Sequence, residues 1–105
     1  MKYKLKISRG KRPVVEVEFE EERYSLLGEM LLAERGLLTE LIGVLDEVHK
    51  SKETEVKTFS GNAFTVYIEG ENVKITNDIN GEETEASAAE LRKLTKAYKK
   101  HYDKL

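Results

Sequence analysis

The fold is decided first by the stretch from residue 3 to residue 19, which reads YKLKISRGKRPVVEVEF. Apolar and charged side chains alternate in its first five and last five positions, as they do in strands with one buried face. An antiparallel register with Ile7 opposite Val15 puts the apolar residues on one face and sets lysines opposite glutamates on the other. Gly10 and Pro13 supply the turn. We therefore predict a β-hairpin whose core-facing residues are Tyr3, Leu5, Ile7, Val15, Val17 and Phe19.

The pattern becomes helical from residue 21 to about residue 50, where apolar residues recur every three or four positions. Gly36 interrupts this pattern, and we predict one long helix, with room for a bend there, in preference to two short ones. A second apolar set lies off the main stripe, so the helix either runs through the middle of the fold or turns a second face to another molecule, for example in a homodimer. The main stripe is Tyr24, Leu27, Leu31, Leu38, Leu41, Leu45 and Val48, and the second set is Leu26, Met30, Ala33, Leu37 and Val44.

Three further strands follow the helical segment. Gly70 provides the turn between the last two of them, which form a hairpin. Residues 77–85 are polar and are predicted to be a loop. The predicted strands are 54–59, 64–68 and 73–76.

A final helix is predicted to begin after Ser87, because Ser87 and Glu90 have the spacing of a capping box. The order ββαβββα describes one α+β domain over residues 1–105. In it, an antiparallel sheet packs against the long helix and an amphipathic C-terminal helix. The buried stripe of that last helix is predicted to be Leu91, Leu94, Tyr98, Tyr102 and Leu105.

Composition excludes several classes of protein. The 105 residues include no cysteine, which excludes disulfides, thiolate nucleophiles and cysteine-ligated metal sites. No apolar run approaches the roughly 18 residues that a membrane helix requires. Lysines alternate with apolar residues at the start of the chain, so we expect no signal peptide, a cytoplasmic location and no membrane partner.

Charge is segregated along the chain although the net charge is only −2. Residues 1–12 carry six cations and no anion, and residues 91–105 carry six cations and one anion. The segment between these two blocks is acidic. The predicted hairpin pairs the first block with glutamates, and the tyrosines of the last helix fall on its buried stripe. We therefore do not expect a nucleic acid as partner.

Motifs for catalysis or cofactor binding are absent from the sequence. His49 and His101 each lie near a predicted helix end and outside any motif, which favours surface residues over catalytic ones. Residues 76–87 faintly match a calcium loop, but the twelfth position is Ser87, where that loop requires a bidentate glutamate. We expect no cofactor, no metal and no enzymatic activity.

The C-terminal half also resembles known bacterial families. Residues 61–75 give a Gly-Asn turn, an apolar strand, an acidic turn and a second strand, and a helix containing Ala97-Tyr98 follows. With the upstream residues 45–48, LDEV, this pattern resembles the YacL-like group of small bacterial proteins. It is also similar to small immunity proteins encoded beside contact-dependent or polymorphic toxins. The resemblance implies a non-enzymatic domain, and its immunity branch implies a protein that blocks a partner.

These observations lead to a functional expectation. A toxin nuclease must present a basic cleft to its substrate, and an acidic surface can fill that cleft. We expect an immunity protein that neutralises a cognate toxin, a nuclease in the first instance, by direct binding. The alternative is a self-associating structural or regulatory domain that uses the second apolar face of the long helix. The predicted partner-binding residues are Asp78, Glu82, Glu83 and Glu85, and the unpaired acids of the long helix are Glu21, Glu22, Glu29, Glu34 and Glu40.

Overall fold

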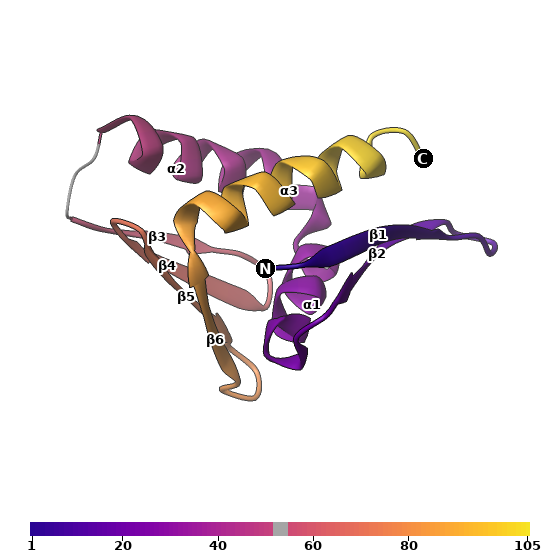
Figure 1. Cartoon of the computed structure of the whole chain (residues 1–105), viewed down its shortest axis with the longest axis horizontal. Coiled ribbons are helices and arrows are strands. Elements are labelled where there is room, and N and C mark those ends of the chain that lie inside the picture. The colour runs from indigo at the N-terminus through magenta and orange to yellow at the C-terminus, as the bar shows by residue number, and fades with distance from the viewer. Residues whose placement is uncertain (52–54) are drawn as a thin grey trace.

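A computed structural model describes residues 1–51 and 55–105 of the chain (Figure 1). These residues form a two-stranded and a four-stranded antiparallel sheet together with helices, which confirms the α+β class. No helix within the two described ranges is long and apolar enough to cross a membrane. The elements are β1 (Tyr3–Ser8), β2 (Val14–Phe19), the 3-10 turn η1 (Glu22–Tyr24), α1 (Ser25–Ala33), the 3-10 turn η2 (Arg35–Leu37), α2 (Leu38–Ser51), β3 (Val56–Ser60), β4 (Phe64–Glu69), β5 (Asn72–Asn77), β6 (Glu83–Ser87) and α3 (Ala88–Tyr102).

The β1–β2 hairpin has the predicted register throughout, with Ile7 opposite Val15. Exposure alternates along the strands as expected, although Val15 is buried and the other apolar side chains are only half-buried. The hairpin is a narrow ribbon that rests on α1 and α3, so water reaches the sides of its apolar residues. On the outer face, Lys6 pairs diagonally with Glu18 over 2.8 Å and not with Glu16 directly opposite.

The predicted single long helix is wrong, because the structure has two helices, α1 and α2, joined by η2. Gly36 lies in that 3-10 turn, where the bend was expected. The break begins at Glu34, whose backbone (φ −103°, ψ 19°) leaves the helical conformation and whose side chain turns into the fold. The main apolar stripe is buried along both helices, at Tyr24, Leu27, Leu31, Leu38, Leu41, Leu45 and Val48.

Helix α1 runs through the middle of the fold, between β2 of the hairpin and strands β5 and β6 of the larger sheet. Both of its faces are therefore covered, and Leu26 and Met30 of the second apolar set are buried. Leu37 and Val44 are half-buried against the same core, and Ala33 is exposed. The apolar excess that suggested a homodimer is thus accounted for by packing within one chain.

The four-stranded sheet has the order β3-β4-β5-β6 and contains the predicted β4–β5 hairpin in the expected register. The predicted strand 54–59 corresponds to β3, which begins at Val56; residue 54 lies outside the described ranges. The predicted loop 77–85 is wrong in its second half, because β6 begins at Glu83 and pairs with β5. Backbone pairing makes β6 a strand, and its side chains are polar because one of its faces meets water.

Helix α3 begins where the capping motif predicts. The backbone N–H of Glu90 donates to Ser87 Oγ over 3.0 Å. The buried residues of the helix include Leu91, Leu94 and Tyr98, as expected, and Tyr102 is half-buried. Leu105 lies beyond the last turn and is 48 % exposed, so its assignment to the buried stripe is wrong.

Two polar contacts fasten α3 to the hairpin. At the start of β1, the amine of Met1 lies 2.7 Å from the carboxylate of Glu90. Farther along, the hydroxyl of Tyr98 donates to the backbone carbonyl of Val15 over 2.9 Å. Burial raises the pKa of Tyr98, which keeps this hydroxyl protonated and able to donate.

A fully buried carboxylate, that of Glu34, joins the α1–α2 junction to the larger sheet. It accepts the backbone N–H groups of Asn62 (2.6 Å), Ala63 (2.9 Å) and Phe64 (2.9 Å) in the turn between β3 and β4. Gly61 completes the fit, because a Cβ there would lie 2.5 Å from both carboxylate oxygens. The placement of Glu34 among the exposed acids of the long helix is therefore wrong.

We expect Glu34→Gln to lower the free energy of unfolding by about 2–4 kcal/mol, because an amide turns a donor toward converging N–H groups and leaves buried donors unsatisfied. Gly61→Ala should also lower the free energy of unfolding, since its Cβ would displace the Glu34 carboxylate from the same N–H groups. Urea unfolding measures both losses. Glu29→Gln, at an exposed position of α1, is the matched control and should stay within about 0.5 kcal/mol of the wild type. Equal losses of stability at positions 29 and 34 would show that the hydrogen bonds of Glu34 do not stabilise the fold.

An ion-pair cluster joins α2 to α3. Asp46 Oδ1 lies 2.6 Å from Arg92 Nε and 3.0 Å from Lys96 Nζ. The hydrogen bonds from Arg92 and then from Lys96 lower the pKa of Asp46 below its ordinary value. The folded state therefore favours the ionised carboxylate at this position.

The stabilisation from Asp46 should depend on pH. Because its folded-state pKa lies below the unfolded value of about 3.9, the contribution is complete above about pH 5 and is lost as the pH falls through the folded-state pKa. The difference in free energy of unfolding between wild type and Asp46→Asn should consequently shrink as the pH is lowered from about 5 toward 2. Denaturant titrations at several pH values measure this difference. A difference that stays constant across the range would show that Asp46 does not stabilise the fold through its charge.

Candidate partner-binding surface

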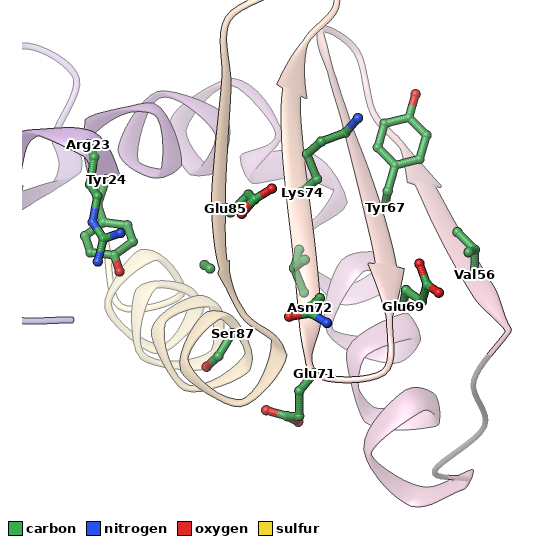
Figure 2. Close-up of a pocket in the computed structure, with 12 residues that line it drawn as sticks. Arg23, Tyr24, Val56, Tyr67, Glu69, Glu71, Asn72, Lys74, Glu85 and Ser87 are labelled. Atoms are coloured by element: carbon green, nitrogen blue, oxygen red, sulfur yellow. The ribbon is translucent and has the colours of Figure 1, made fainter.

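The larger sheet has one face that packs against the core and one that meets solvent. The inner face carries the buried residues Phe59, Val66 and Ile75. On the outer face, antiparallel pairing aligns exposed side chains in rows across the four strands. One row consists of Thr58, Tyr67, Lys74 and Glu85, and Figure 2 shows the last three of these.

A hollow of about 660 Å³ is lined by residues of this outer face and of η1 (Figure 2). Val56 and Tyr67 give it exposed apolar surface, with 55 % and 39 % of each residue exposed. Lys74 also lines the hollow, and its Nζ lies 5.2 Å from the centre of the Tyr67 ring and 3.2 Å from a carboxylate oxygen of Glu83. Three further carboxylates line the hollow and form no ion pair within the described ranges: Glu69, Glu71 and Glu85.

The loop between β5 and β6, residues 78–82, is held in place by its own polar groups. Asn77 Oδ1 accepts the backbone N–H of Ile79 over 2.9 Å. Asn80 Oδ1 accepts the backbone N–H of Glu82, also over 2.9 Å. Gly81 has φ +77°, a left-handed conformation that glycine adopts without strain. The loop therefore has a defined shape.

Ile79 stands at the tip of this loop with 82 % of its surface exposed, more than any other large apolar residue in the described ranges. Its backbone N–H is held by Asn77 Oδ1, so the backbone position from which the isoleucine projects is fixed within the loop. The prediction of a polar loop missed this residue. The available signal was a single isoleucine between Asp78 and Asn80, with no neighbouring apolar residue to share a core contact.

The four predicted acids lie along one edge of the molecule, from the loop into the outer face of β6, and we call them the acidic edge (Asp78, Glu82, Glu83 and Glu85). Glu82 and Glu85 form no ion pair with any described residue. Asp78 accepts a hydrogen bond from Thr65 Oγ1 over 2.7 Å, and Glu83 forms the ion pair with the lysine of β5 described above. The edge therefore contains two carboxylates engaged within the chain and two free to meet a partner.

The described residues contain no group of three or more histidines, aspartates or glutamates that could hold a metal ion. His49 is exposed on α2, and His101 Nδ1 lies 2.9 Å from the carbonyl oxygen of Ala97 within α3. The surface around the acidic edge can present negative charge together with an apolar side chain.

Comparison of the chain with protein-family models, with curated proteins and with solved structures gave no match in any of the three. The resemblance to immunity proteins therefore stays an expectation from the sequence.

The exposure of Ile79 predicts a contrast with Ile75, a fully buried residue four positions earlier on β5. Ile75→Ala should lower the free energy of unfolding by about 2–5 kcal/mol, since it leaves a cavity in the core. Ile79→Ala should change it by no more than about 0.5 kcal/mol. Urea denaturation of the two variants makes the comparison directly. A loss above about 1 kcal/mol at position 79 would mean that the isoleucine serves folding and not recognition.

Proposed function

We propose that this chain is a non-enzymatic binding domain that docks on a basic protein partner through the acidic edge and Ile79. In keeping with the resemblance, the partner is a cognate bacterial toxin, in the first instance a nuclease, and the chain acts as its immunity protein. Binding covers the basic cleft that the toxin needs for its own substrate.

The observation that carries this proposal is the exposure of Ile79 on a loop of defined shape, together with the carboxylates of Glu82 in that loop and Glu85 on the adjoining β6, which form no ion pair with any described residue. Interfaces gain most of their energy from a few well-buried anchors, with polar groups around them. An anchor that is already held in position loses little conformational entropy on binding. Glu82, in the same loop, and Glu85, on β6, form no ion pair with any described residue, so a basic surface does not have to break existing ion pairs to reach them.

The choice of a basic partner follows from charge. The acidic edge and the carboxylates of the neighbouring hollow outnumber the cations Lys74 and Arg23 that share this region. Arg23 is itself paired with Glu21 over 2.7 Å. Complementary charge of this kind accelerates encounter and selects against acidic partners.

The first test of the immunity assignment is the neighbouring gene, which should encode a secreted toxin with a basic catalytic domain. We then expect the double variant Glu82→Lys/Glu85→Lys to associate with that domain about tenfold more slowly at low salt and with a flatter salt dependence. Ile79→Ala should instead raise the dissociation rate by about tenfold, as loss of an anchor does. Stopped-flow measurements of the purified pair separate the two rates.

A matched control is Glu29→Lys/Glu40→Lys, which makes the same change in net charge at exposed positions of α1 and α2. Its association rate should stay much closer to that of the wild type. If both double variants slow association equally, net charge and not the acidic edge steers the encounter. A neighbouring toxin domain that does not bind the chain at micromolar concentration would overturn the immunity assignment.

A further inference from the structure

The ends of the two basic blocks, the β1–β2 turn and the last turn of α3, are separated by most of the chain but lie toward the same end of the structure (Figure 1). The contact between Met1 and Glu90 joins the start of the hairpin to the start of α3, and the contact between Tyr98 and Val15 of β2, which lies opposite Ile7 of β1, joins the helix to the far part of the hairpin. Helix α3 therefore runs along the hairpin in the direction of β1. Both proceed toward the same end of the long axis, where the β1–β2 turn projects beyond the helices (Figure 1).

The cations at this end are distinct from the lysines of the outer hairpin face. That face carries Lys2, Lys4 and Lys6, and the latter two lie opposite glutamates of β2. The turn residues lie past the last strand pair, Ser8 with Val14, and are exposed. We call the following five residues the basic end, and none of them forms an ion pair within the described ranges: Arg9, Lys11 and Arg12 of the turn, with Lys100 and Lys104 of the α3 terminus.

Few acids oppose these cations. Asp103, the residue that follows α3, lies 2.5 Å from Lys99 Nζ four residues earlier. Glu16 follows Val15 on β2, two positions farther from the turn than Val14, and it lies opposite Lys6. A protein with a net charge of −2 thus concentrates positive charge at one end.

We propose that the basic end binds the phosphate backbone of double-stranded DNA, with the β1–β2 turn entering the major groove. A two-stranded ribbon fits the major groove of B-form DNA, and arginine can grip a phosphate with two parallel hydrogen bonds. Across its long axis the molecule measures 28 × 26 Å, so the turn and the end of α3 both fall within one helical turn of a duplex, about 34 Å. The turn, SRGKRP, offers no large apolar side chain for insertion into a lipid bilayer.

This inference revises the expectation from sequence that nucleic acid is not a partner. That expectation assigned the whole first basic block to the cross-strand pairs of the hairpin. In the structure those pairs stop before the turn, and α3 adds its own lysines at the same end. The inference does not rest on the proposed function, because it uses a different surface and a different ligand.

The test uses a fluorescent DNA duplex of about 20 base pairs and measures binding by anisotropy across a series of salt concentrations. Wild type should bind at low salt, and the logarithm of its affinity should fall with the logarithm of salt with a slope of up to about −4.5 for five phosphate contacts. Arg9→Ala/Lys11→Ala/Arg12→Ala should flatten that slope by about 3 and weaken binding at low salt by at least about tenfold. Lys100→Ala/Lys104→Ala should flatten it by about 2.

The matched control is Lys2→Ala/Lys4→Ala/Lys6→Ala, which removes the same charge from the same hairpin at exposed positions. It should leave the salt slope within about one unit of the wild type. Equal weakening by the two triple variants would overturn the proposal, because it would assign binding to diffuse charge. No binding to the duplex at low salt would also overturn it. Binding to anionic phospholipid vesicles but not to DNA would show that the basic end recognises a membrane surface instead.

Discussion

The fold depends on one buried carboxylate that receives three backbone N–H groups. Glu34 ends α1, starts the turn into α2 and holds the segment from Gly61 to Phe64 against that junction. The three backbone N–H donors compensate the cost of burying this carboxylate. The contact also requires glycine at position 61. It sets where the four-stranded sheet meets the helices, and hence which face of the sheet is left to solvent.

A second constraint is the central position of α1. Because the hairpin covers one side of this helix and the sheet covers the other, the chain buries two apolar faces of a short helix without a partner. The hairpin is then free to extend past the core and carry its turn away from it, beside the end of α3. The same packing that satisfies the core therefore gathers positive charge at one end, while the acids of β6 lie on the open sheet.

Features set by local periodicity could be predicted from the sequence, and features set by tertiary contacts could not. The hairpin register follows from alternation between Tyr3 and Phe19, and the start of α3 follows from Ser87 and Glu90. Nothing local distinguishes Glu34 from an exposed helical acid, since its partners lie about thirty residues away. For the candidate site, charge pointed to the acidic residues, but their division into engaged and free carboxylates depends on Thr65 and the pairing of β6.

The exposed isoleucine and the projecting basic turn have a common physical meaning. Each presents side chains that the described part of the fold does not use: Ile79 is 82 % exposed, and Arg9, Lys11 and Arg12 form no ion pair with a described residue. The hydrogen bond at Ile79 would form equally well with a polar residue there, because it involves only the backbone N–H. Folding therefore gives no reason for either feature. Since they lie on different elements, β5–β6 and β1–β2, occupation of one surface by a protein would leave the other open to DNA.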